Sequence, residues 1–200
     1  MIFIFGDSHA RYNFKNLSIP NVNLSENSIT MHRIGRDNII INFNPEYNNS
    51  NNIFILCYGE VDCRCHIAKQ IALGRDKYEI CKLLVENYFN TIKNNIRQYK
   101  AIIIVSVTPP MARKPFEDIH GPLTHEFPML GDDQERVENT KIINNLLEEY
   151  CKIYKFTFFN ISNFYSDYDG TLIFKYSDTI AHIEQNEYIL ETLSEIINRL

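Results

Sequence analysis

The first nine residues of the chain constrain its fold most. Residues 1–5 form an unbroken run of apolar residues, most of them β-branched or aromatic, and Gly6-Asp7-Ser8-His9 follow at once. A short apolar run that stops at a glycine predicts a buried strand followed by a sharp turn. In an open α/β sheet, ligands bind beyond the carboxyl ends of the strands, so Ser8 would lie at the mouth of a site. From this stretch alone, an equally good interpretation is that Ser8 only caps a helix that begins near His9.

The rest of the chain alternates between apolar runs and amphipathic segments. Further strands are expected over residues 53–57, 101–107 and 156–161. Helices are expected over 76–99 and 132–154, where apolar residues recur at three- and four-residue steps, and over about 184–200. Strands that are apolar throughout indicate a parallel sheet covered on both faces. We therefore predict an α/β fold, a three-layer α/β/α sandwich with a central parallel sheet of about five strands.

Three other segments carry weaker signals. Residues 21–28 are polar and rich in asparagine, so we expect a loop there. Residues 39–43 have the composition of a strand. Residues 111–131 contain proline, histidine and methionine without periodicity, and we expect a long loop, in which His120 and His125 are solvated.

Composition limits the class of protein and the kind of partner. A chain of 200 residues that is 44% hydrophobic can bury one core, which favours a single domain over residues 1–200. The net charge of −5, with basic residues scattered, excludes a nucleic-acid partner and favours a small molecule. The N-terminal apolar run is too short for a signal peptide or a membrane span, so we expect no membrane partner and a cytoplasmic location. An odd number of cysteines, five, fits that reducing compartment.

Three separated segments contain the residue types of a serine nucleophile site: residues 6–9, 58–62 and 178–182. A serine hydroxyl needs an adjacent base, usually a histidine that a carboxylate orients, and Ser8, His182 and Asp178 are of the right types. The oxyanion of the reaction also needs hydrogen-bond donors. The amides of Ser8 and Gly35, and a side chain from the turn at Gly59, are candidates.

In these residues the chain resembles the SGNH family, also called GDSL-type hydrolases and acyltransferases. The resemblance lies in a GDS block after the first strand, a later glycine, a block beginning with Gly59 and an Asp-His block near the end of the chain. It implies a flavodoxin-like sandwich that forms a single catalytic domain. It also implies that Ser8 is the nucleophile, His182 the base and Asp178 its orienting acid, with Ser8 and Gly35 as oxyanion donors.

Two positions depart from the family pattern. Val61 stands where the family has its oxyanion asparagine. Asp178 precedes His182 by four residues instead of three, and Thr179 occupies the usual position of the acid. These departures put the second oxyanion donor and the orienting role of Asp178 in question.

A subgroup with GDSH and YGExDxRxH blocks is similar to this chain over residues 6–9 and 58–66. Such domains occur in glycan-modifying proteins, including sugar N-acetyltransferases of giant viruses, and can be fused to a further sugar-modifying domain. The resemblance implies transfer of an acetyl group from acetyl-CoA to a sugar amine or hydroxyl. An esterase that uses water as the acceptor, or a catalytically silent carbohydrate-binding domain, are the alternatives.

The same blocks suggest further site residues. Arg64 either replaces the missing asparagine as an oxyanion donor or pairs with Glu60 or Asp62 to hold the turn. His9 and Arg11 either contact the substrate or cap the first helix. The expected substrate-binding residues are Asp7, His9, Arg11, Gly59, Glu60 and Asp62. Cys63, Cys65 and His66 lack the spacing of a zinc site, so we expect no metal.

Overall fold

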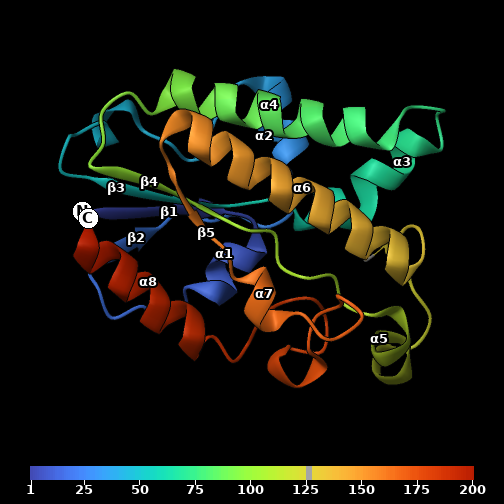
Figure 1. The fold of residues 1–200 in the computed structure, drawn as a ribbon. Coiled ribbons are helices and arrows are strands. Elements are labelled where there is room, and N and C mark those ends of the chain that lie inside the picture. The colour runs from blue at the N-terminus through green and yellow to red at the C-terminus, as the bar shows by residue number, and fades with distance from the viewer. Residues whose placement is uncertain (125–127) are drawn as a thin grey trace.

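A single parallel sheet forms the centre of the computed structural model, which describes residues 1–124 and 128–200; the expectation for His125 lies outside these residues. Its five strands follow the order β2–β1–β3–β4–β5, and all neighbours are parallel (Figure 1). The strands are β1 (Ile2–Gly6), β2 (Asn21–Asn23), β3 (Ile53–Cys57), β4 (Ala101–Val105) and β5 (Thr157–Phe159). This is the flavodoxin-like order. The predicted three-layer α/β/α fold is confirmed.

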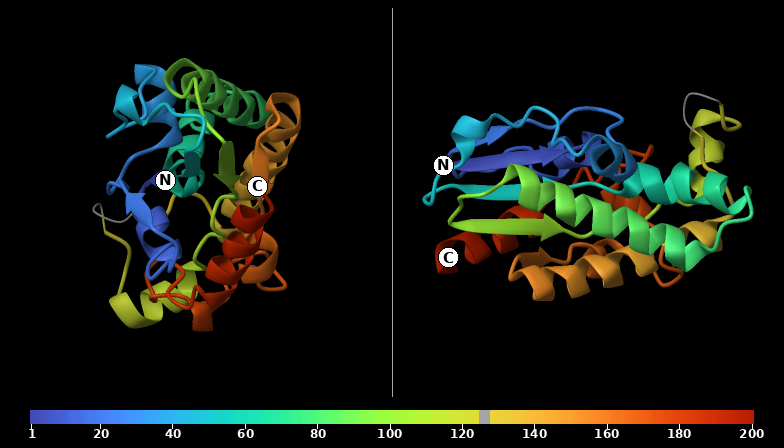
Figure 2. Two further views of the ribbon diagram at one scale, coloured as in Figure 1. Left: turned by 90° about the vertical axis from the view of Figure 1, so that its left-hand side faces the viewer. Right: turned by 90° about the horizontal axis from the view of Figure 1, so that it is seen from above.

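Helices cover both faces of the sheet. On one face α2 (Met31–Asp37), α4 (Lys77–Asn95) and α6 (Asp133–Tyr154) pack on Phe3, Phe5 and their neighbours. On the other face α1 (Ser8–Asn13) and α8 (Glu187–Arg199) pack on Ile2, Ile4 and theirs. Figures 1 and 2 show α4 and α8 on opposite sides of the sheet, with the two termini at the same end. Apart from Gly6, each residue of β1, β3 and β4 therefore enters one of two cores, as the apolar runs predicted.

Shorter elements connect these layers. They are the 3₁₀ turns Pro45–Tyr47 and Phe174–Tyr176, the π-helical turn Asp62–His66, and the helices α3 (Ile67–Ile71), α5 (Arg113–His120) and α7 (Ser162–Tyr165). No described helix combines the length and apolar character needed to cross a bilayer.

Three expectations for secondary structure were wrong. Residues 21–28, expected as a loop, contain the edge strand β2, whose exposed position tolerates asparagine. Residues 39–43, expected as a strand, form a turn in which Asn42 adopts a left-handed backbone (φ 63°), while Ile40 is buried. The expected loop over 111–131 contains α5, where Phe116 packs into the core.

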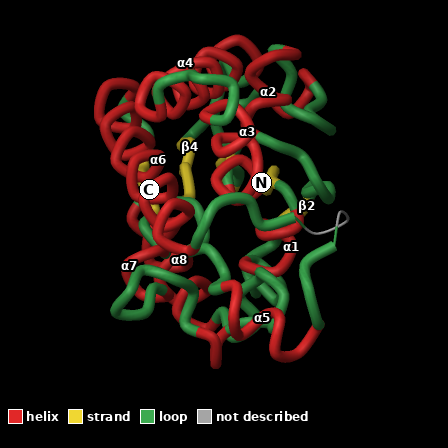
Figure 3. Tube along the Cα trace, turned by 90° about the vertical axis from the view of Figure 1, so that its right-hand side faces the viewer, coloured by secondary structure: helices red, strands yellow, loops and turns green. Residues whose placement is uncertain are grey.

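The strand order reverses at β1, and this places the candidate site. The chain leaves β1 toward β2 on one side, while β3 lies on the other, and a crevice forms at such a reversal. Ser8 follows β1, and Glu60 follows β3. Figure 3 views the molecule along the strands, from the side at which their carboxyl ends lie.

Asp62 anchors α2 to the segment that follows β3. Its carboxylate oxygens accept hydrogen bonds from the amides of Met31 (2.6 Å) and His32 (3.1 Å). Thr30 Oγ1 accepts a third hydrogen bond, from the Arg33 amide (3.0 Å). Burial of Asp62 raises the pKa of its carboxyl to about 7, although the two amide hydrogen bonds act to lower it. Asp62 therefore fixes the start of α2, and its contribution to the free energy of unfolding depends on pH.

The variant Asp62→Asn tests this coupling. Asparagine offers one acceptor oxygen for two amides, so we expect a loss of about 1–3 kcal/mol in unfolding free energy at pH 4.5. Between the pKa of about 3.9 in the unfolded chain and that of about 7 in the fold, native Asp62 binds a proton that the unfolded chain has released. The stability of the native protein therefore falls as pH rises through this window. The difference in unfolding free energy between the native protein and Asp62→Asn should therefore become smaller as pH rises. Urea unfolding from pH 4.5 to 8 measures this difference.

Thr30→Ala is the matched control for this measurement. It removes the other hydrogen bond at the start of α2 without removing a titrating group, at a cost of about 1 kcal/mol. Its effect should stay constant over the same pH range. A gap between native protein and Asp62→Asn that stays constant or widens with pH would contradict the assignment.

Candidate active site

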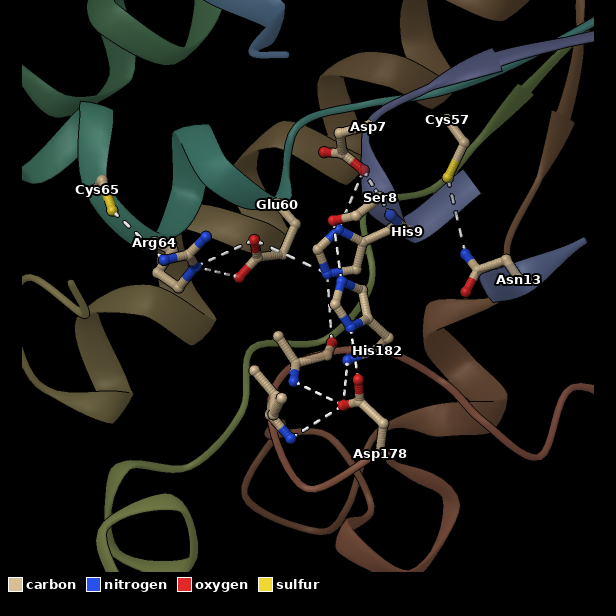
Figure 4. Close-up of polar contacts among 12 residues, drawn as sticks. Asp7, Ser8, His9, Asn13, Cys57, Glu60, Arg64, Cys65, Asp178 and His182 are labelled. Atoms are coloured by element: carbon tan, nitrogen blue, oxygen red, sulfur yellow. Dashed lines mark hydrogen bonds and ion pairs between the residues drawn. The ribbon is translucent and has the colours of Figure 1, made fainter. Parts of the chain in front are cut away.

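Ser8, His182 and Asp178 form a continuous hydrogen-bonded chain (Figure 4). His182 Nε2 lies 2.9 Å from Ser8 Oγ, and His182 Nδ1 lies 2.6 Å from Asp178 Oδ2. Burial acts to raise the pKa of Asp178, but hydrogen bonds from the His182 ring and from backbone amides hold it well below its usual range. Asp178 is therefore an anion that orients the imidazole, and the imidazole faces the serine hydroxyl. This is the geometry of an activated serine nucleophile.

The additional residue between Asp178 and His182 is accommodated by a tight turn. Thr179 adopts a left-handed backbone (φ 68°). Asp178 Oδ1 accepts hydrogen bonds from the amides of Ile180, Ala181 and His182 at 2.9 to 3.0 Å. The turn folds around the carboxylate, so the four-residue spacing still brings Asp178 to the His182 ring.

Two further rings pack against His182. Tyr12 stacks on it with ring centroids 4.1 Å apart and planes 8° apart. The His9 ring lies 4.7 Å away. Sequence reasoning missed Tyr12, although its position four residues after Ser8 places both on one face of a helix.

His9 is a buried cation. Its Nδ1 lies 3.0 Å from Asp7 Oδ1 and its Nε2 lies 3.2 Å from the carbonyl oxygen of Ala181. A carboxylate and a carbonyl only accept hydrogen bonds, so both ring nitrogens of His9 must donate. Burial opposes this charged form, but Asp7 and Glu60 together raise the pKa of His9 above its ordinary value. The imidazolium thereby joins the turn after β1 to the loop of His182.

Arg64 is paired with Glu60. Arg64 Nε donates to both carboxylate oxygens of Glu60 at 2.8 and 3.1 Å, and Nη1 donates to the carbonyl of Pro128 at 2.9 Å. Burial acts to raise the pKa of Glu60, but Arg64 and His9 hold it below its usual range. Of the two alternatives for Arg64, the structure shows the pair with Glu60. Arg64 also lines the cavity at Ser8, and its role as an oxyanion donor stays a prediction.

A cavity of about 540 Å³ opens at the triad. Its wall comprises Ser8, His9, Arg11 and Tyr12 of α1, Lys15, the turn at Asn27 and Ser28, Val61, Arg64, Ala181 and His182. The Ser8 amide forms no hydrogen bond with any described residue, so it is available as an oxyanion donor. The cavity has the size of a small-molecule site.

The prediction that Gly35 is an oxyanion donor was wrong. Gly35 lies within α2 and packs against α4, where a Cβ would come within 2.7 Å of Asn87 Cβ. It lines a separate cavity, between α2 and α4. The glycine is needed for this helix contact and not for catalysis. Ser28, in the turn before α2, lines the cavity at Ser8 instead and has a left-handed backbone (φ 61°); no sequence signal distinguished it.

Four of the six expected substrate-binding residues lie behind the cavity wall. Asp7 and Glu60 are buried partners of His9 and Arg64, and Asp62 caps α2. Gly59 turns the chain at φ 117°, where a Cβ would meet Val107 at 2.8 Å. These four support the site and do not form its surface. The other two, His9 and Arg11, line the cavity.

The remaining histidines and cysteines have structural contacts. His120 is exposed, as expected, and it also contacts the Oγ1 (3.0 Å) and carbonyl oxygen (3.1 Å) of Thr179, which ties α5 to the triad loop. Cys63 and Cys65 are buried, and His66 stacks on His32 at 4.1 Å. Within residues 1–124 and 128–200, no three His, Cys, Asp or Glu side chains are grouped to hold a metal ion.

Comparison with known proteins gives matches in structure only. No family model and no curated protein matches the sequence. A candidate platelet activating factor protein from Streptococcus pneumonia is 16% identical, with a TM-score of 0.66 over 98% of this chain and 83% of its own. A GDSL-like lipase from Bacteroides thetaiotaomicron is 14% identical, with a TM-score of 0.60 over 99% and 87%. The aryl esterase of M. smegmatis is 14% identical, with a TM-score of 0.52 over 100% and 98%.

Identities this low establish the fold and nothing finer. The similarity covers almost the whole of this chain in each case. The chain thus has the fold of GDSL-type, or SGNH, hydrolases.

Proposed function

We propose that this chain is an acyl-transferring enzyme whose nucleophile is Ser8. The observation that carries the proposal is the chain of hydrogen bonds from Ser8 through His182 to Asp178 at the wall of a cavity. More specifically, the enzyme moves an acetyl group from acetyl-CoA to a sugar amine or hydroxyl, on a nucleotide sugar or a glycan precursor. The support for this is the resemblance over residues 6–9 and 58–66 to domains of glycan-modifying proteins. We place the enzyme in the cytoplasm, where acetyl-CoA is present, and infer that it can be fused to a further sugar-modifying domain.

The first half of the reaction forms an acyl-enzyme. Ser8 Oγ attacks the thioester carbonyl while its proton passes to His182 Nε2. The amide of Ser8, with Arg64 as a second donor, stabilises the oxyanion. When the tetrahedral species collapses, the C–S bond breaks and the CoA thiolate takes the proton from His182. Asp178 stabilises the imidazolium that exists between these two transfers.

The second half returns the enzyme to its starting state. An amine or hydroxyl of the sugar attacks the acyl-Ser8 carbonyl and gives a proton to His182. The same proton then passes to Ser8 Oγ as the ester bond breaks. If an acetylated sugar replaces acetyl-CoA as the donor, the sugar hydroxyl leaves with the proton from His182 in the first half. Water then attacks the acyl-Ser8 carbonyl in the second half, and the enzyme is a carbohydrate esterase. The GDSL-like lipase and the aryl esterase among the structural matches favour this second candidate.

The assembled triad argues against the third candidate, a silent carbohydrate-binding domain. A protein that only binds sugar has no need of a 2.9 Å contact between a serine hydroxyl and an imidazole that a carboxylate orients. Such contacts require buried or strained groups, here Asp178 and Thr179, and these are maintained where they serve chemistry.

Release of free CoA from acetyl-CoA, with and without nucleotide-linked amino and hydroxy sugars, tests the proposal. Ser8→Ala and His182→Ala should each lower acceptor-dependent release by about 10⁴-fold or more, because nucleophile and base act as a unit. Ser18→Ala, an exposed serine outside the cavity, is the control and should retain full activity. Ser8-dependent hydrolysis of acetylated sugars without CoA release would establish the esterase instead. No turnover in either assay would refute both enzymes.

Asp178→Asn tests the orienting role of the carboxylate. The asparagine oxygen can still accept from the three amides of the turn, so its NH₂ group would face His182 Nδ1. That group only donates, which forces the ring proton onto Nε2 and leaves no acceptor for the Ser8 proton. We expect kcat to fall about 10²- to 10⁴-fold with a small change in KM. Steady-state kinetics with a short acyl ester would show this; activity within twofold of the native protein would contradict the assignment.

A further inference from the structure

Of the Asp, Glu, Lys, Arg and His side chains, only basic ones line the cavity at Ser8. They are His9, Arg11, Lys15, Arg64 and His182, and no carboxylate is part of the described wall. The protein as a whole carries 25 acidic and 20 basic residues, with a net charge of −5. The sign of the charge in this cavity is therefore opposite to that of the molecule.

Two of these basic residues have no counter-ion. His9, Arg64 and His182 are matched by Asp7, Glu60 and Asp178. Arg11 donates one hydrogen bond, to the carbonyl oxygen of Ser25 at 3.3 Å, and forms no ion pair within the described residues. The Lys15 ammonium has no hydrogen bond or ion pair with any described residue. Both charges are exposed and available to a ligand.

Their position relative to Ser8 is set by α1 and by the turn that follows it. Ser8 and Arg11 lie three residues apart in α1, which places them on one face of the helix. The helix ends at Asn13, and Lys15 lies in the turn that follows, where its amide donates to the carbonyl of Tyr12 at 3.2 Å. With a rise of about 1.5 Å per residue, Arg11 lies about 4 Å along the helix from the nucleophile, and Lys15 lies beyond the end of the helix.

A second hollow lies next to these two residues. It has a volume of about 390 Å³ and shares Arg11 and Lys15 with the cavity at Ser8. The rest of its lining comprises Phe14, Asn16, Leu17, Asn21, Asn23 and Ser25. Arg11 and Lys15 therefore border both hollows.

We propose that the substrate carries a phosphate or carboxylate group, which Arg11 and Lys15 bind at the wall of the cavity beside the reacting carbonyl. A guanidinium binds the two oxygens of such a group together, and an ammonium adds a point charge beside it. The anion therefore belongs to the part of the substrate beyond the acyl group, such as the diphosphate of a nucleotide sugar, a phosphate of CoA or the carboxylate of an acidic sugar. The inference rests on the proposed function, since it concerns the same cavity.

The experiment compares Arg11→Gln/Lys15→Gln with the native protein on two donors of the same acetyl group. With neutral p-nitrophenyl acetate, KM should change much less than with the anionic substrates, because this ester has no anionic group for the two side chains to bind. With acetyl-CoA and a nucleotide-linked sugar, KM for at least one of the two should rise tenfold or more, and added salt should raise it in the native protein only. Equal KM values and equal salt dependence in both proteins would overturn the proposal. The control is Lys82→Gln/Arg97→Gln, which removes two exposed charges outside both hollows; Arg97 resembles Arg11 in donating to one backbone carbonyl (3.3 Å).

Ligand binding separates this proposal from the enzymatic one and identifies the anion. Pyrophosphate and glucuronate are titrated into the native protein, Ser8→Ala and Arg11→Gln/Lys15→Gln by calorimetry. Binding to the first two that weakens tenfold or more in the third supports the proposal, even if no turnover is found. Tighter binding of pyrophosphate assigns the site to phosphate, and tighter binding of glucuronate assigns it to carboxylate. Absence of binding of either anion, in an enzyme that still turns over the neutral ester through Ser8, refutes the anion site alone.

Discussion

The site depends on the imidazolium of His9, which lies between Asp7 and Glu60 beneath the cavity. Asp7, His9, Glu60 and Arg64 form a buried row of alternating charges that is neutral as a whole, with contacts of 2.8 to 3.8 Å. Burying ions in isolation is expensive, and a row of this kind is tolerated because each charge faces an opposite one. The row joins the turn after β1 to the turn after β3. Removing any one member leaves an unpaired charge in the interior, so each of these residues is stable there only while the other three are present.

This row also determines where the catalytic base lies. His9 Nε2 donates to the carbonyl of Ala181, the residue before His182. Tyr12, one helical turn after His9, stacks on the His182 ring from another side. The short helix α1 therefore carries the nucleophile and two of the groups that position its base. Arg11 lies in the same helix and Lys15 in the turn that follows it. The nucleophile, the orientation of the base and the two unpaired cations of the cavity therefore all depend on this helix and its turn.

The sequence predicts the scaffold better than it predicts the wall of the cavity. Apolar runs identify β1, β3 and β4 because strands buried on both faces have no polar positions. The edge strand β2 gives no such signal, since the asparagines that form it also suit a loop, and Ile40 in the wrongly expected strand is buried by a turn. The triad follows from residue types and from the family resemblance. Its departure in spacing is explained only by the left-handed Thr179, because a sequence does not specify which residue takes up an insertion.

Gly35 was wrongly predicted to lie in the site and Tyr12 was missed, and both errors have the same cause. A glycine is required both by a site where backbone approaches a ligand and by a helix where another helix approaches closely, and only the fold decides between them. Here Gly35 meets Asn87 of α4. Tyr12 has no motif to mark it, yet the helical phase set by Ser8 brings it against His182. Residues whose role depends on the relative placement of two elements are those that sequence reasoning misses.

The distance along the chain between Ser8 and His182 has a consequence for the order of folding. The acid and the base arrive together in one five-residue turn, whereas the nucleophile lies 174 residues earlier. β1 lies inside the sheet, so Ser8 is fixed as soon as β1 and β3 pair. Contacts of such long range form late, because loop closure must precede them. During synthesis Ser8 therefore has no base beside it until His182 has emerged, and His182 follows all five strands of the sheet in the chain.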